Sequence, residues 1–145
     1  MTKIPRVSVL MPAYNSEKYI AEAIESILNQ TYSDFEFIII NDGSTDNTPK
    51  IIKEYAKKDK RIKFINNGKN QGIVAVLNQG LDLCTGEYVA RMDSDDVSLP
   101  ERFEKQIEYM DTHHECGVVG AAIQIFGDKS LVWQNASSVK LFDLI

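Results

Sequence analysis

Apolar residues along the chain occur in two alternating patterns, which predict a regular succession of strands and helices. Short runs in which nearly every residue is apolar are typical of strands covered on both faces, and residues 35–40 form the clearest of these runs. Longer segments repeat an apolar residue every three or four positions, as at Ile20, Ile24 and Ile27, and this spacing indicates helices. The predicted strands are 7–11, 35–40, 62–65 and 87–92, with a later pair at 118–126 and 131–134. The predicted helices are 17–30, one that begins at Thr48-Pro49, 73–83, and one that opens at Ser98-Leu99-Pro100.

This order of strands and helices predicts an α/β fold, in which a mostly parallel sheet carries helices on both faces and an antiparallel pair forms its edge. We expect Pro12 to end the first strand and Asn15 or Ser16 to cap the first helix. In such sheets ligands bind outside the carboxyl ends of the strands. The loops after the first four predicted strands are therefore the expected place of a site.

The size and charge of the chain narrow the range of functions. A length of 145 residues is enough for one domain with its own core and too short for two. The net charge of −5 argues against non-specific nucleic-acid binding, which needs an excess of Lys and Arg. Two isolated cysteines, no signal-peptide pattern and no apolar run of about 20 residues favour a cytoplasmic protein. Any association with a membrane would come through a longer parent protein or a partner.

A polar loop follows the second predicted strand, and its first carboxylate is a candidate ligand-binding group. Asp42 stands at the end of the apolar run, so its side chain should lie at the mouth of the sheet and accept hydrogen bonds from a nucleotide base or ribose. The alternative is helix capping, because Asp, Asn, Ser and Thr all cap helices. Capping accounts for residues 46–48 better than for an acid at the end of a buried strand.

Three carboxylates, Asp93, Asp95 and Asp96, follow the fourth predicted strand, with no basic partner nearby in the sequence. Carboxylates this close repel each other unless a cation is present. Oxygen ligands suit Mg²⁺ or Mn²⁺, which often bind one or two carboxylates together with substrate phosphates. The alternative is a solvated acidic turn, but the position after a strand places these acids at the same edge as Asp42. We therefore predict a metal site at this edge.

Two other loops of the same edge offer groups that suit a nucleotide. Tyr14 presents a ring on which a base can stack and a hydroxyl that can form a hydrogen bond. Asn70 and Gly72 open the helix 73–83, and the N-terminus of a helix favours phosphate groups. The first loop lacks the GxGxxG pattern of nicotinamide dehydrogenases, and the chain has no GxxxxGK[ST] segment of the kind found in P-loop phosphotransferases.

Four motifs in a fixed order resemble those of the family-2 glycosyltransferases, whose nucleotide-binding domain has the three-layer, Rossmann-like fold called GT-A. The motifs are Val9-Leu10-Met11-Pro12-Ala13-Tyr14-Asn15, then Asn41-Asp42-Gly43-Ser44-Thr45-Asp46, then Asn70-Gln71-Gly72 with Asn78 and Gly80, then Gly86-Glu87-Tyr88 leading to Asp93-Ser94-Asp95-Asp96. The resemblance covers about residues 5–125 and implies that residues 1–145 are a single nucleotide-sugar-binding domain.

The resemblance implies a metal-dependent, inverting transfer of a sugar from a nucleoside diphosphate sugar to an acceptor hydroxyl. The frequency of donors in the family favours a UDP-sugar, with a glycan or lipid-linked acceptor, in polysaccharide or glycoconjugate biosynthesis, and with Mn²⁺ or Mg²⁺ as cofactor. The predicted nucleotide-sugar-binding residues are Pro12, Tyr14, Asp42, Asn70, Gly72, Asp93 and Ser94. Among them, Asn70 and Gly72 are the residues that open the helix 73–83. The implied metal ligands are Asp95, Asp93 and Asp96.

The sequence departs from the family pattern in two places. Many members have a basic residue just before the helix asparagine, but here that position is Leu77, which offers the diphosphate no charge. The family's second half supplies the acceptor site and the catalytic base, so we expect the chain to end before the acceptor-binding part and the base to lie beyond Ile145. The alternative function is a domain that binds nucleotide-sugar without turnover, or an inactive fragment. The apolar segment 141–145 suggests self-association through the C-terminal tail.

Overall fold

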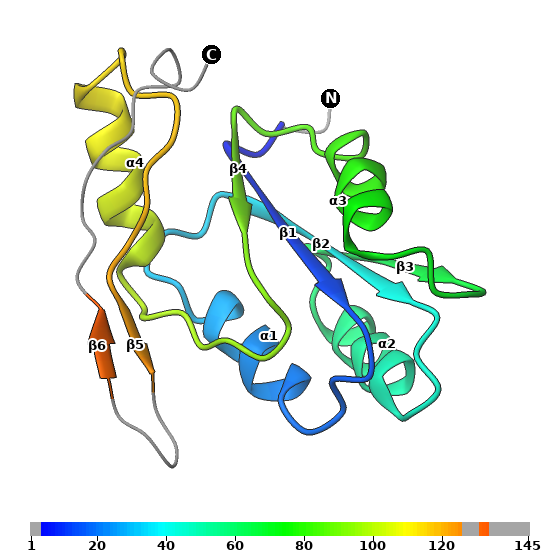
Figure 1. Cartoon of the computed structure of the whole chain (residues 1–145). Coiled ribbons are helices and arrows are strands. Elements are labelled where there is room, and N and C mark those ends of the chain that lie inside the picture. The colour runs from blue at the N-terminus through cyan, green and yellow to red at the C-terminus, as the bar shows by residue number, and fades with distance from the viewer. Residues whose placement is uncertain (1–3, 126–130, 134–145) are drawn as a thin grey trace. The chain divides into compact units, whose positions relative to one another are not determined.

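The computed structural model describes residues 4–125 and 131–133, and the chain divides into two compact units, residues 1–99 and 100–145. The first unit contains a four-stranded parallel sheet in the order β3-β2-β1-β4 (Figure 1). Its elements are β1 (Val7–Ala13), α1 (Ile20–Leu28), β2 (Phe35–Asp42), α2 (Thr48–Lys58), β3 (Ile62–Asn67), α3 (Ile73–Leu81) and β4 (Tyr88–Arg91). Every predicted site residue belongs to this unit.

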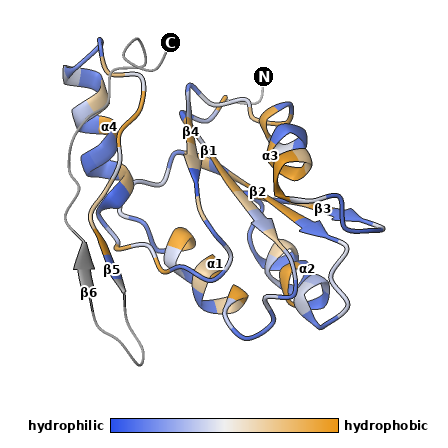
Figure 2. Ribbon diagram, in the orientation of Figure 1, coloured by the Kyte–Doolittle hydropathy of each residue, from blue (hydrophilic) through white to orange (hydrophobic). Residues whose placement is uncertain are grey.

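The core of the first unit forms around β1 and β2, at the centre of the sheet. Every residue of both strands is buried, because each strand has a neighbour on both sides and helices cover both faces. Figure 1 shows α3 on one face and α1 and α2 on the other, and Figure 2 shows hydrophobic residues along both central strands. Val76 of α3 packs against Leu10, Ile38 and Ile40. The predicted α/β fold, with three layers and a parallel sheet, is confirmed.

The prediction that Pro12 ends the first strand is wrong, because β1 continues to Ala13. Proline has no N–H, yet it fits here for a geometric reason. Along a strand, the backbone N–H and C=O groups of every second residue face the same neighbouring strand. The carbonyl of Leu10 faces β4, because it accepts the N–H of Met92. Pro12 faces that same side, but β4 pairs with β1 only as far as Leu10. No ladder hydrogen bond is lost there.

Two helices begin later than predicted, because the expected capping side chains have other partners. α1 starts at Ile20 rather than 17, because the Ser16 hydroxyl pairs with the Ser94 hydroxyl instead of capping the helix. The Ser16 carbonyl accepts the N–H groups of Tyr19 and Ile20 in a turn that precedes the helix. The helix after β4 starts at Arg102 rather than near Pro100. The Ser98 hydroxyl, expected at that helix opening, accepts a hydrogen bond from Gln30 Nε2 instead.

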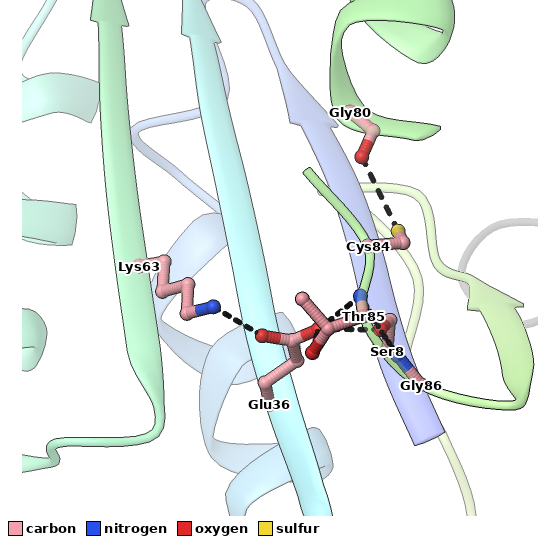
Figure 3. A network of polar contacts seen from close by, with 7 residues as sticks. All are labelled: Ser8, Glu36, Lys63, Gly80, Cys84, Thr85 and Gly86. Carbon is pink, nitrogen blue, oxygen red and sulfur yellow. Dashed lines mark hydrogen bonds and ion pairs between the residues drawn. The ribbon is translucent and has the colours of Figure 1, made fainter. Parts of the chain in front are cut away.

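A buried carboxylate fixes the entry of β4 onto the sheet (Figure 3). Glu36 of β2 is 5% exposed and accepts hydrogen bonds from the Ser8 hydroxyl at 2.6 Å and from the N–H and hydroxyl of Thr85 at 2.8 and 2.9 Å. Lys63 Nζ lies 2.5 Å from its other oxygen. Burial would raise the pKa of Glu36, but these hydrogen bonds outweigh burial and lower the pKa to about 2. The network therefore holds an ionised carboxylate that ties Thr85, just before β4, to the two central strands.

The second unit contains α4 (Arg102–Thr112), β5 (Ile123–Ile125) and β6 (Leu131–Trp133). The two strands form the predicted antiparallel pair, but β5 begins at Ile123 rather than 118, and the pair makes a two-stranded sheet of its own rather than the edge of the larger one. Within residues 4–125 and 131–133, no helix is long and apolar enough to cross a membrane. The segment 141–145, for which we predicted self-association, lies outside the described residues.

Candidate functional site

An open cavity of about 470 Å³ lies at the carboxyl ends of β1, β2 and β4. This volume falls in the range of small-molecule sites, and the position is the one expected for ligands of parallel α/β sheets. Its lining residues come from the carboxyl ends of those three strands, from the loops after β1 and β4, and from the segment that leads into α3 together with the first residue of that helix. They are Pro12, Ala13, Tyr14, Asn15, Ser16, Tyr19, Asp42, Asn70, Gly72, Ile73, Arg91, Asp93, Ser94 and Asp95.

The loop after β1 is fastened to the loop after β2 by hydrogen bonds through one asparagine. The N–H of Asn15 donates to the Ser44 hydroxyl at 2.9 Å, and Asn15 Oδ1 accepts the N–H of Thr45 at 2.9 Å. Asn15 has a φ of 49°, in the left-handed region, which asparagine adopts more readily than most residues. This fastening sets the position of Tyr14, whose side chain is half-exposed at the rim of the cavity.

The same first loop is joined to the acidic loop after β4 through two serine hydroxyls. Ser16 Oγ lies 2.6 Å from Ser94 Oγ, and both residues are buried. The N–H of Ser16 donates to the Thr48 hydroxyl at 2.8 Å, which fixes the serine against the start of α2. Sequence reasoning considered Ser16 only as a helix cap and missed this link, because the two serines are 78 positions apart.

Asp42 lies at the floor of the cavity and holds the segment that leads into α3. Asp42 is 4% exposed, and its carboxylate accepts the N–H of Gln71 at 2.9 Å and that of Gly72 at 3.0 Å. The two loops approach so closely that a Cβ on Gly43 would lie 2.4 Å from the carbonyl carbon of Lys69, and Gly43 has a φ of +69°. Only glycine fits that position without displacement. Asp42 thereby brings Asn70 and Gly72 to the cavity.

The acidic loop contains an ion pair that the sequence analysis did not anticipate. Arg91, the last residue of β4, places Nη2 2.9 Å from Asp93 Oδ1, so the expectation that the acids have no basic partner nearby is wrong. Arg91 precedes Asp93 by two residues, and that spacing was the available signal. Asp95 is exposed and lines the cavity, whereas Asp96 is exposed and is not among the lining residues.

The structure brings together all seven residues predicted to bind the nucleotide-sugar, and two of the three predicted metal ligands. Leu77, in contrast, is partly buried against the core cluster of Leu10 and Val76. The charged side chains of the cavity lining are three carboxylates, those of Asp42, Asp93 and Asp95, and one guanidinium, that of Arg91. An anionic ligand would thus meet a site that is negative overall unless further positive charge enters with it.

The fold and the cavity together define a Rossmann-like protein with a ligand site at the carboxyl edge of its sheet. The chain belongs to glycosyl transferase family 2, whose sequence profile matches residues 8–143. It is 46% identical over 129 residues to an uncharacterized glycosyltransferase of Haemophilus influenzae, covering 89% of this chain and 40% of that protein. It is 43% identical to a chondroitin synthase of Escherichia coli, covering 72% of this chain and 15% of that protein.

Solved structures show the same likeness. A crystal structure of S. aureus TarS in complex with UDP-GlcNAc superposes with a TM-score of 0.77 and 31% sequence identity, covering 86% of this chain and 36% of that chain. The chain therefore spans less than half the length of the proteins that it matches.

Proposed function

We propose that residues 1–145 form the nucleotide-sugar-binding domain of a glycosyltransferase that uses a UDP-sugar and a divalent cation, Mn²⁺ or Mg²⁺. The observation that carries this proposal is the convergence of the ends of three strands, the loops after β1 and β4, and the α3 entry on one cavity, with aromatic, amide and carboxylate groups around it. TarS, to which the chain is 31% identical, has been crystallised with UDP-GlcNAc, which supports a uridine diphosphate sugar as the donor.

The roles follow from where the side chains lie. Pro12 and Tyr14 form the wall on which the base and ribose rest, because they lie on either side of the last residue of β1 and line the cavity, next to the loop that the Asn15 hydrogen bonds fix. Asp42 accepts hydrogen bonds from the base or ribose while it retains the two amides of the α3 entry, since a carboxylate has about four acceptor sites. Asn70 and Gly72 then complete the wall on the α3 side.

The acidic residues suit a divalent cation whose coordination shell is completed by oxygen atoms of the substrate. Among the described residues no group of three or more His, Cys, Asp or Glu side chains converges as a closed metal cage. Asp95 lines the cavity and is the proposed main ligand, and Asp93 is already paired with Arg91. Asp96, the next residue after Asp95, is proposed to support the cation in second place. Mg²⁺ and Mn²⁺ suit this arrangement, because they take one or two carboxylates and fill their remaining positions with water and phosphate oxygens.

In the proposed reaction an acceptor hydroxyl attacks the anomeric carbon from the face opposite the diphosphate, so the configuration inverts. The carbon–oxygen bond to the diphosphate breaks as the new bond forms, and the hydroxyl proton passes to a carboxylate base. The bound cation supplies positive charge to the leaving diphosphate. This chain holds and orients the donor, and we place the base and the acceptor site outside residues 1–145. Similarity to a chondroitin synthase supports a glycan acceptor, and a lipid-linked acceptor is the other candidate.

Substitution of the exposed carboxylate at the cavity tests the proposal. UDP should bind Asp95→Asn at least about ten-fold more weakly than the parent in Mn²⁺, a loss of about 1.4 kcal/mol. In EDTA the two proteins should bind UDP equally, because the carboxylate acts through the cation. Asp82→Asn, at the exposed end of α3 away from the cavity, is the matched control and should behave as the parent in both conditions. Equal affinity of Asp95→Asn and the parent in Mn²⁺ would remove the metal role from this loop.

A further inference from the structure

Arg91 occupies a place in the sheet from which its side chain reaches the cavity. In the β1–β4 ladder Arg91 stands opposite Leu10, and paired residues of parallel strands share a face of the sheet. Leu10 points toward α3, since a Cβ on Gly80 would lie 2.2 Å from its Cδ1. Arg91 is therefore on the α3 face, at the carboxyl end of its strand, and it lines the cavity together with Ile73 at the start of α3.

The pair that Arg91 makes with Asp93 leaves the guanidinium within reach of a ligand. The arginine side chain is 58% exposed and the aspartate side chain 45% exposed, although one Arg91 nitrogen lies 2.9 Å from the carboxylate. An ion pair in solvent contributes little stability and rearranges at low cost. A guanidinium carries five N–H donors in one plane, so it can serve a carboxylate and a phosphate oxygen at the same time.

Arg91 is the one cation among the lining residues that the structure describes, against three carboxylates. Leu77, the helix residue that faces the same Leu10 cluster, supplies no charge. Among the described lining residues, a diphosphate in this cavity would thus meet one positively charged side chain. Arginine is suited to that contact, because its planar fork matches phosphate geometry.

We propose that Arg91 binds a phosphate oxygen of the nucleoside diphosphate while it keeps its ion pair with Asp93, and so gives the diphosphate a contact that does not depend on the metal. The inference rests on the proposed function. Under this proposal the two acidic residues have different roles. Asp95 acts through the cation, whereas Asp93 orients Arg91. The affinity of the protein for the diphosphate in the absence of metal should then depend on Arg91.

The test compares UDP with uridine, in EDTA, by calorimetric titration of the parent and of Arg91→Met. The parent should bind UDP more tightly than uridine, because only UDP offers phosphate oxygens. Arg91→Met should lose about ten-fold in UDP affinity and none in uridine affinity, while Arg91→Lys should retain part of the difference because it keeps the charge. Arg6→Met is the control, since Arg6 forms a comparable pair with Glu87 Oε2 at 3.3 Å, before the start of β4.

Several results would overturn the inference. One is a parent that binds UDP and uridine equally in EDTA, and another is an Arg91→Met protein that binds UDP as the parent does. A third is equal loss of UDP and uridine affinity in Arg91→Met, which would mean that Arg91 shapes the loop rather than contacts phosphate. If the parent bound neither ligand, with or without Mn²⁺, the proposed function itself would fail, and the two failures are thereby distinguishable.

Discussion

Replacement of Glu36 by glutamine should reduce stability in a way that depends on pH. The substitution keeps the shape of the side chain and removes the charge that Lys63, Ser8 and Thr85 surround. In the folded protein the pKa of Glu36 falls from its ordinary value of 4.5 to about 2, a difference of about 2.5 pH units. At about 1.4 kcal/mol per unit, the ionised carboxylate contributes about 3 kcal/mol to the free energy of unfolding at neutral pH.

The sign follows from the direction of the pKa change. A depressed folded-state pKa gives stability that is fully present above pH 4.5 and is lost as the pH falls toward 2. At pH 3 the same linkage leaves about 1 kcal/mol, less than half of the value at pH 7. Glu36→Gln should therefore be about 3 kcal/mol less stable than the parent at pH 7, and the gap should narrow steadily below pH 4.5.

Urea unfolding followed by circular dichroism, at intervals from pH 7 to pH 3, measures both quantities. Glu54→Gln is the matched control, because Glu54 forms an exposed pair with Lys57 on α2 and should show no measurable gap at any pH. A gap between Glu36→Gln and the parent that stayed constant from pH 7 to pH 3 would refute the electrostatic reasoning and point to packing alone. Parent-like stability of Glu36→Gln at pH 7 would refute the network's contribution altogether.

Two further predictions concern the floor of the cavity. Gly43→Ala should lower both the melting temperature and the UDP affinity, because its Cβ would displace the Lys69 backbone and with it the α3 entry. Gly68→Ala, where a Cβ meets nothing within 4 Å, should change neither, and equal effects of the two substitutions would contradict the close-approach argument. Asp42→Ala should weaken UDP binding by about 1–3 kcal/mol and also lower the melting temperature, because the carboxylate both faces the ligand and holds two backbone amides. A lower melting temperature with unchanged UDP affinity would reduce Asp42 to a structural role.

The sheet and its site edge were predictable from the sequence because they rest on local signals. The apolar run of β2 reads as a strand buried on both faces, and a polar residue directly after such a strand must lie at the carboxyl edge. This reasoning placed Asp42, Tyr14 and Asp95 at that edge, and all three line the cavity. The limits of the elements were less predictable, as Pro12 shows, since its place in β1 depends on where a different strand ends.

Contacts between distant segments were not predictable, because the same residue types serve several purposes. Ser16 is a plausible helix cap by sequence, and only the approach of the acidic loop turns its hydroxyl to Ser94. Asp42 could have pointed entirely at solvent, and only the path of the chain before α3 places Gln71 and Gly72 against its carboxylate. Such hydrogen bonds depend on the tertiary arrangement, which local propensity does not encode.

The central claim is that a nucleoside diphosphate and a divalent cation meet at the cavity at the carboxyl ends of β1, β2 and β4. Paramagnetic broadening of amide signals by Mn²⁺ in the presence of UDP, in ¹H–¹⁵N correlation spectra of the labelled protein, tests both the ligands and the place. With Mg²⁺ as the diamagnetic reference, the signals of residues 13–16, 70–73 and 93–96 should broaden selectively, and EDTA should restore them. Broadening confined to other segments, or UDP-induced shifts unaffected by either metal or EDTA, would contradict the account.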